Sequence, residues 1–146
     1  MIVTVDELGK TSLYPEIIDN ITRGDKEAAE LQILAAEEFA KSYLFKYDIA
    51  AIFGTETTEP TFKSQLIKKI VKIIASYYLV RLANPNVDLE LYRKDYEDAV
   101  TLLKDLRDGN NNAGLPYAED DNSTPDTDEG NSDICWDSNV KRKNFF

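Results

Sequence analysis

Histidine is absent from this sequence of 146 residues, and cysteine occurs only once, as Cys135. Without histidine, the chain lacks the most common general base and the most common metal ligand of proteins. A lone cysteine cannot close an internal disulfide or build a thiolate metal cluster, so a reducing compartment is the default. We therefore expect a protein that is not an enzyme and that holds no cofactor or metal.

Basic residues are also scarce, and long apolar runs are missing. The 17 Lys and Arg residues stand against 27 Asp and Glu residues, which gives a net charge of −10. A nucleic-acid partner requires a basic surface, so this balance argues against that class. No stretch reaches the roughly 18 continuous apolar residues of a membrane span, and the first ten residues lack the pattern of a signal peptide. We expect no membrane partner.

Amphipathic helical sequence is what the chain does contain, and its longest stretch covers residues 61–83. Apolar side chains at helical spacing form one face, and four lysines lie opposite: Phe62, Leu66, Ile70, Ile73, Ile74 and Tyr77 against Lys63, Lys68, Lys69 and Lys72. Tyr78, Val80 and Leu82 widen the apolar face until it nearly closes. A helix with so much apolar surface must be covered by neighbours, so this stretch is predicted to be the central helix.

Further helices are predicted on both sides of the central one. Residues 26–47 are rich in Ala, Glu, Leu and Lys, which favour helices, and residues 89–108 repeat apolar side chains at helical spacing before Gly109. Residues 48–60 are expected to form a loop. Short helices are predicted after Thr4 or Asp6 and at Pro15. The fold class is therefore all-α: a small bundle of three main helices with one or two short N-terminal helices.

Several residue types in these helices allow two interpretations. The four lysines form either a solvated face or a contact for an acidic neighbouring subunit. The outer face of the helix at 26–47 is expected to include Glu30, Glu37, Glu38 and Lys41. Six tyrosines at helical spacing are expected to pack in the core with their hydroxyls at its rim: Tyr43, Tyr47, Tyr77, Tyr78, Tyr92 and Tyr96.

The composition changes after Gly109, which divides the chain into a helical domain at 1–109 and an extended tail at 110–146. Residues 109–146 carry 8 acidic and 3 basic residues, a net charge of −5. Aromatic anchors beside basic residues dominate the energetics of many interfaces. The tail ends in such a set, which we predict to bind a partner or a neighbouring subunit, although a flexible end is the alternative: Ile134, Trp136, Lys141, Arg142, Lys143, Phe145 and Phe146.

Four segments of the sequence resemble a known family. They are TVDELGKTS at 4–12, EAAELQILAAEEFAKSYLFKYDI at 27–49, the pair LIKKIVKIIASYYLVRLANP and LYRKDYEDAVTLLKDLRDG within 66–109, and WDSNVKRKNFF at 136–146. Together they resemble the small helical head–tail connector, or adaptor, proteins of tailed bacteriophages, in particular those of the Mu-like prophage branch. The acidic insert at 118–133 departs from the pattern of that family.

The resemblance implies a virion structural protein at the head–tail junction, assembled in the host cytoplasm. Such proteins are expected to form a homo-oligomeric ring, typically a dodecamer, that binds the portal protein and the tail or further connector proteins. DNA would pass through the ring lumen without specific binding. The family offers no catalytic residues. The alternative is a soluble helical adaptor or regulatory module that binds a partner through its C-terminal linear motif.

Overall fold

A computed structural model describes residues 1–83, 88–111 and 113–118, and this part of the chain is an all-α bundle, as predicted. Its helices are α1 (Val5–Thr11), α2 (Pro15–Thr22), α3 (Lys26–Tyr43), α4 (Ile49–Phe53), α5 (Gln65–Leu82) and α6 (Leu89–Asp108). Among the described residues there is no strand, and the only β-type pairing is an isolated antiparallel bridge between Tyr47 and Tyr117.

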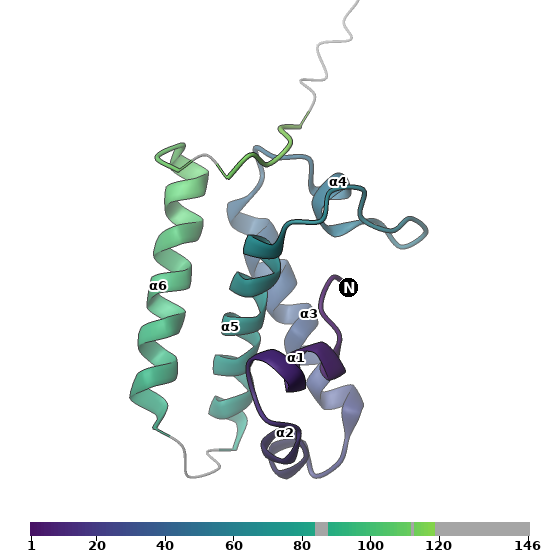
Figure 1. Ribbon diagram of the computed structural model, residues 1–146, viewed down its shortest axis with the longest axis vertical. Coiled ribbons are helices and arrows are strands. Elements are labelled where there is room, and N and C mark those ends of the chain that lie inside the picture. Colours follow the sequence, from purple (N-terminus) through teal and green to yellow (C-terminus); the bar gives the residue numbers. More distant parts are fainter. Residues whose placement is uncertain (84–87, 112, 119–146) are drawn as a thin grey trace, which may run out of the picture.

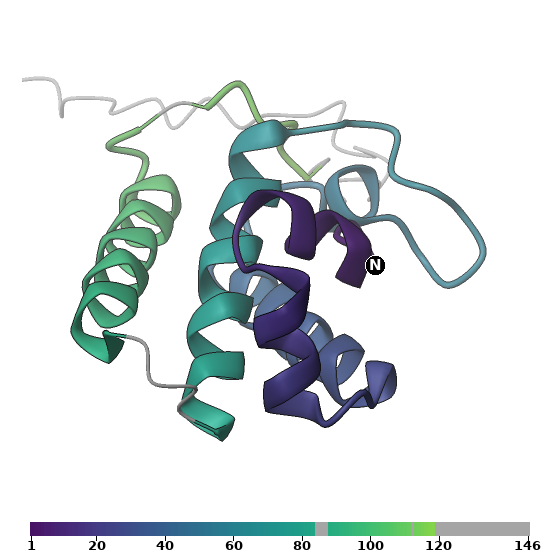
Figure 2. The same ribbon diagram turned by 60° about the horizontal axis from the view of Figure 1, so that its bottom comes forward.

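Helix α5 is the centre of the bundle, as its sequence predicts. It packs against α3 behind it, α6 on one side and α2 on the other (Figures 1 and 2). Because it has neighbours on three sides, it buries residues around most of its circumference: Ile67, Ile70, Val71, Ile74, Ala75, Ser76, Leu79 and Val80. Leu82, near its C-terminal end, is 56% exposed. The nearly closed apolar face is thus covered within the subunit up to Val80.

The central helix begins later than the prediction of residue 61. Ser64 has an extended backbone, and its hydroxyl accepts a hydrogen bond from the backbone N–H of Ile67. Phe62 lies before the helix, and its N–H donates to the carbonyl of Ala51 at 2.9 Å. Phe62 therefore contributes to the core from a connecting segment that packs against α4.

The predicted loop at 48–60 is wrong in its first half, because α4 occupies it. The carboxylate of Asp48 caps this helix by accepting a hydrogen bond from the N–H of Ala51 at 2.9 Å, and Ile52 and Phe53 are buried. Gly54 ends the helix with a φ of 77°. A Cβ at that position would lie 2.6 Å from the carbonyl oxygen of Thr58, so the turn requires glycine.

Helix α3 ends at Tyr43, four residues before the predicted end of the 26–47 helix. Leu44 leaves the helical conformation, and the chain turns so that Tyr47 enters the core with 4% of its surface exposed. The Tyr47 hydroxyl donates a hydrogen bond to the carbonyl of Leu106 at 2.9 Å. This side chain therefore joins the end of α3 to the last turn of α6, and its hydroxyl does not lie at the rim of the core.

Helix α6 confirms the prediction of a helix at 89–108. Asp88 caps its start by accepting a hydrogen bond from the N–H of Glu90, and Gly109 ends it in the left-handed region. The apolar stripe faces α5 and α3, with Ala99, Leu103 and Leu106 buried.

The chain then packs back on the bundle over residues 113–118. Leu115 is buried, the N–H of Asp48 donates to the carbonyl of Pro116 at 2.9 Å, and the N–H of Ala118 donates to the carbonyl of Lys46 at 3.1 Å. The ring of Tyr117 stacks on that of Tyr47 with centroids 5.0 Å apart. The packed helical unit therefore includes these residues as well.

Glu37 is buried with 2% of its surface exposed, so its predicted place on the outer face of α3 is wrong. Its carboxylate accepts hydrogen bonds from the N–H groups of Ile2 and Val3, and the amino group of Met1 lies 3.9 Å from Oε2. These contacts supply partners for backbone groups that are themselves buried with Ile2 and Val3. Glu37 thus anchors the first residues of the chain to α3.

Replacing Glu37 by alanine is expected to lower the free energy of unfolding by about 2 kcal/mol, because the buried N–H groups lose their acceptor. Chemical denaturation of the variant and the parent measures the difference. The control is Glu38→Ala at the adjacent exposed position, where the change is expected to be below about 0.5 kcal/mol. Equal effects of the two substitutions would contradict the anchoring role of Glu37.

Candidate functional site

A groove with a volume of about 740 Å³ lies between α5 and α6 and is closed at one side by the end of α1. Its apolar lining comes from both long helices and includes the half-buried side chains of Leu66, Ile73 and Leu102. Thr11 and Ser12 form the border on the α1 side.

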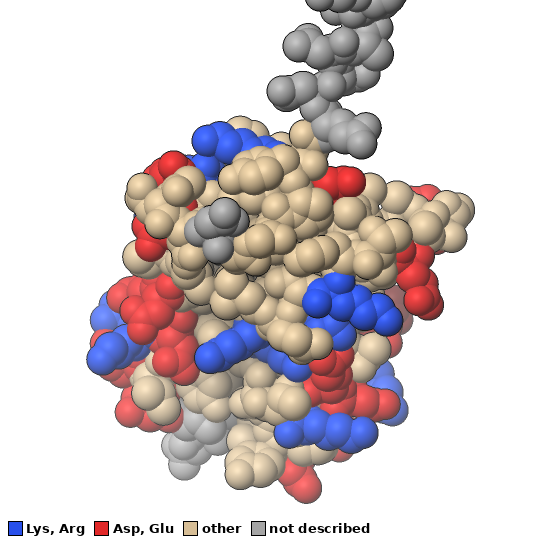
Figure 3. Space-filling model, turned by 45° about the horizontal axis from the view of Figure 1, so that its top comes forward, with Lys and Arg blue, Asp and Glu red and all other residues tan. Residues whose placement is uncertain are grey.

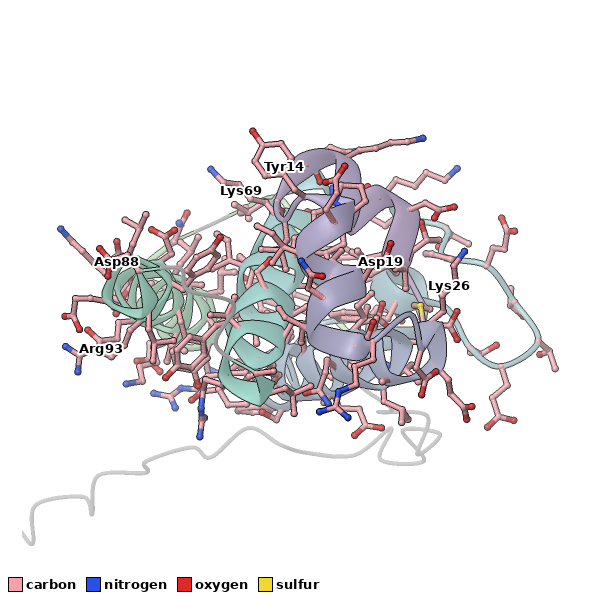
Figure 4. All side chains as sticks on the ribbon, turned by 90° about the horizontal axis from the view of Figure 1, so that it is seen from below. Tyr14, Asp19, Lys26, Lys69, Asp88 and Arg93 are labelled. Carbon is pink, nitrogen blue, oxygen red and sulfur yellow. The ribbon has the colours of Figure 1, made fainter. Side chains whose placement is uncertain are left out.

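The two walls of the groove carry charges of opposite sign. Lys69 and Lys72 lie on α5, and Asp95 and Asp98 lie on α6. Figure 3 shows acidic side chains with basic ones beside them at the left, and further basic side chains nearer the middle of the same face. Figure 4 shows Lys69 at the α5 surface on the same side as Tyr14, the residue before α2. The groove therefore offers an apolar floor between a basic and an acidic border.

The hydroxyl of Ser76 is the one buried side-chain oxygen or nitrogen without a hydrogen-bond partner among the described residues. Ser76 lies on α5, lines the groove and is 3% exposed. Buried hydroxyls in folded proteins almost always have a partner. A ligand with a polar group at this depth would supply one.

Of the four lysines predicted to lie on one face, Lys63 precedes α5, and two of the three on α5 bind α1. Lys72 Nζ lies 2.9 Å from Oε1 of Glu7, and Lys68 Nζ lies 3.4 Å from Oε2 of the same carboxylate. The hydrogen bond from Lys72 and the charges of both lysines hold the pKa of Glu7 below its usual value, against a smaller opposing effect of burial. Lys68 and Lys72 thus have their acidic partner within the same subunit, and neither interpretation drawn from the sequence, a solvated face or a contact with an acidic neighbouring subunit, is required to explain them. Lys63 and Lys69 remain exposed.

An aromatic cluster joins α3, α5 and α6 at the other side of the bundle core. Tyr77 stacks on Tyr96 with centroids 4.6 Å apart, and Phe39 contacts Tyr43 and Tyr96 at 5.2 and 6.2 Å. Burial raises the pKa of Tyr78, also in this cluster, to about 12, with a further contribution from Tyr96. These tyrosines are half-buried. They pack helices together, as their spacing predicts.

A stripe of exposed apolar side chains follows the outer face of α3 and the residues after it. Leu31 is 56% exposed, Leu34 is 40% exposed and Phe45 is 62% exposed. Leu31 and Leu34 lie three residues apart on one face of α3, and Phe45 follows just after the helix ends at Tyr43. We call these three residues the α3 stripe. Large apolar side chains aligned on one face mark an interaction surface when another chain covers them.

The interface residues predicted from the tail lie outside the residues that the structure describes: Ile134, Trp136, Lys141, Arg142, Lys143, Phe145 and Phe146. The described residues contain no group of three or more Cys, Asp or Glu side chains that could hold a metal ion. None of the helices described here is long and apolar enough to cross a membrane.

A family model described as Bacteriophage Mu, Gp36 matches residues 5–132, which is most of the chain. The chain belongs to the Bacteriophage Mu Gp36 family. The predicted likeness to Mu-like phage proteins is thereby confirmed at the level of the family. The match covers all six helices of this Gp36-family bundle and ends before Trp136. No curated protein and no solved structure matches the chain.

The family points to a part in phage structure or morphogenesis. The functional features of this Gp36-family chain that sequence reasoning missed are the groove and its Ser76 hydroxyl. The apolar repeats of α5 and α6 predict two helices that pack together, but not the distance between them. Leu31 and Leu34 interrupt the polar surface of α3, and nothing in the local pattern shows that both are exposed.

Replacing Glu7 by glutamine is expected to lower the free energy of unfolding at neutral pH by about 0.5 kcal/mol, the size of a partly exposed ion pair. The folded-state pKa of Glu7 lies below the ordinary value of 4.5, so the contribution is present above that pH and is lost as the pH falls below it. Denaturation from neutral to acidic pH tests this.

The matched control for Glu7 is Glu30→Gln, at an exposed position that has no ion pair in the described part of the chain. Its effect on stability should be close to zero at every pH. A Glu7 effect that stays constant as the carboxyl protonates would rule out the ion pairs as its cause.

Proposed function

We propose that this protein is a virion structural protein, a head–tail connector subunit that joins the portal to the tail. Its partners are further copies of itself in a ring, a dodecamer in this proposal, the portal protein, and tail or further connector proteins. The ring lies at the head–tail junction of the virion, after assembly in the host cytoplasm, and its role is structural and not catalytic.

The observation that carries the proposal is the α3 stripe on a bundle of the Bacteriophage Mu Gp36 family. The interior of the bundle already has a complete apolar core built around α5. Leu31, Leu34 and Phe45 are therefore not needed for the core, and their exposure carries a cost in solution that a neighbouring subunit would remove. An assembling subunit is the simplest protein that keeps such a surface.

The charge of the chain supports a channel for DNA. The net charge of −10 makes binding of phosphates unfavourable, since affinity for DNA depends on neutralising phosphate charge with Lys and Arg. A ring lumen that repels the DNA backbone leaves the DNA able to slide. DNA would then pass through the lumen without specific binding.

The tail is the second element of the proposal. Residues 134–146 contain one tryptophan, two phenylalanines and three consecutive basic residues, which are residue types enriched at interface hot spots. Tethering to the bundle raises the effective concentration of this segment near an adjacent subunit. We assign the segment to contacts between neighbours in the assembly.

Substituting Leu31→Glu together with Leu34→Glu is expected to abolish assembly, because two charges would have to be buried unpaired at the interface. The secondary structure should be unchanged, since both residues are exposed. Sedimentation with purified portal protein measures assembly, and circular dichroism measures helix content. The control Leu89→Glu with Leu91→Glu places the same two charges on similarly exposed leucines of α6 and should still assemble.

Deleting residues 134–146 is expected to prevent ring assembly while helix content stays constant. A gentler variant replaces Trp136, Phe145 and Phe146 by alanine, and its control replaces Ser123, Thr124 and Thr127 in the acidic segment by alanine. Electron microscopy with portal protein counts the rings. Complete rings of the truncated chain would refute the role of the tail, and a monomer that ignores portal altogether would favour a regulatory adaptor over a connector.

A further inference from the structure

We propose that the α5–α6 groove is the site on each subunit that receives residues 134–146 of a neighbouring copy. This inference rests on the proposed function, because it requires two copies side by side. It goes further by naming the receiving surface. Four observations carry it: the lining of the groove, its charges, the buried Ser76 hydroxyl and the path of the chain up to Ala118.

The lining fits aromatic anchors. Leu66, Ile73 and Leu102 are half-buried and line a groove of about 740 Å³. That volume lies in the range of sites that bury a ligand of several ring systems. Trp136 and the Phe145–Phe146 pair supply side chains of this kind, and seating them would remove apolar surface of both partners from water.

The acidic wall fits the basic triplet. Asp95 and Asp98 lie one helical turn apart on α6, are exposed, and have no ion pair among the residues that the structure describes. Lys141, Arg142 and Lys143 precede the final aromatic residues, with Asn144 between them. Opposite charges at the border of an apolar contact fix its register and exclude other partners. The triplet would therefore lie along α6 while the aromatic side chains enter the groove.

The Ser76 hydroxyl is a hydrogen-bonding group within the lining of the groove. It is buried, lines the groove and lacks a partner in the described part of the chain. A hydroxyl can donate one hydrogen bond and accept others, so either backbone group of a docked segment satisfies it. A peptide meets this need, whereas a purely apolar occupant does not.

The path of the chain puts the groove of a neighbouring copy within reach. The hydrogen bonds of Pro116 and Ala118 with residues 46–48 hold the chain at the α3–α4 junction, and Figure 1 shows this segment leading from the end of α6 toward α4. The 15 residues from 119 to 133 can span about 50 Å when extended. The 20 residues of α6 measure about 30 Å, so the tether can pass beyond one subunit.

Disulfide trapping in the full-length chain tests the proposal, because Cys135 is the only cysteine and lies within the segment. One protein keeps Cys135. A second, made larger by a fused domain, carries Cys135→Ser with Lys69→Cys on the groove. The control carries Cys135→Ser with Lys26→Cys, an exposed lysine on the side of the bundle opposite α6 (Figure 4). The two proteins are mixed with portal protein under a mild oxidant.

The expected result is that Cys135 links to K69C at least about tenfold faster than to K26C, because docking raises its local concentration at the groove. Alanine at Trp136, Phe145 and Phe146 of the Cys135 partner should bring the K69C rate down to that of the control. Equal rates for K69C and K26C would overturn the proposal. The proposal would also be overturned if a chain that carries both Cys135 and K69C formed the disulfide between them within a monomer.

Failure of this inference and failure of the proposed function are separable in the same samples. Rings counted by electron microscopy in the absence of K69C links would leave the connector role standing and refute the groove. Absence of both rings and links would refute both. The variant Ser76→Ala adds an independent readout, because loss of the buried hydroxyl should slow the K69C link by several-fold without changing helix content.

Discussion

The bundle depends on one constraint, which is that α5 has apolar surface on almost every side. A helix of this kind is stable in water only when neighbours enclose it. Helices α3, α6 and α2 do so directly, and α1 is attached by the ion pairs of Glu7 with Lys68 and Lys72. The connecting segments also contribute, since Phe62 and Leu115 belong to the same core. The short helices are therefore parts of one cover around α5.

Enclosure of α5 also accounts for the position of the two surfaces proposed for assembly. The α3 stripe points away from α5 and is not required for the cover, so it is available to another subunit. The groove is the place where the cover by α6 and α1 is incomplete, which leaves Ser76 buried without a partner in the described structure. The two surfaces proposed for assembly are thus the ones that the core does not use.

Sequence reasoning predicted the helices whose boundaries have local signals. Helix α6 has a signal at each end, the N-cap Asp88 and the terminating Gly109, and both of its boundaries were predicted correctly. Helix α4 has five residues, too few to show a period, and it was missed. Tyr47 continues the helical sequence pattern of α3 but lies outside that helix, because its hydroxyl donates a hydrogen bond to the carbonyl of Leu106, 59 residues away. Glu37 is buried because distant backbone groups bond to it, and the groove depends on interhelical spacing, so neither could be predicted.

The attachment of residues 113–118 has a mechanical consequence. In the proposed assembly, a pull on the chain beyond Ala118 would act first on its hydrogen bond with Lys46 and on that of Pro116 with Asp48. Tyr47 supports these bonds from the core, because its ring stacks on Tyr117 and its hydroxyl donates a hydrogen bond to the carbonyl of Leu106. Tension on the tail would therefore have to break these hydrogen bonds and the Tyr47–Tyr117 stacking before it could unwind the last turn of α6.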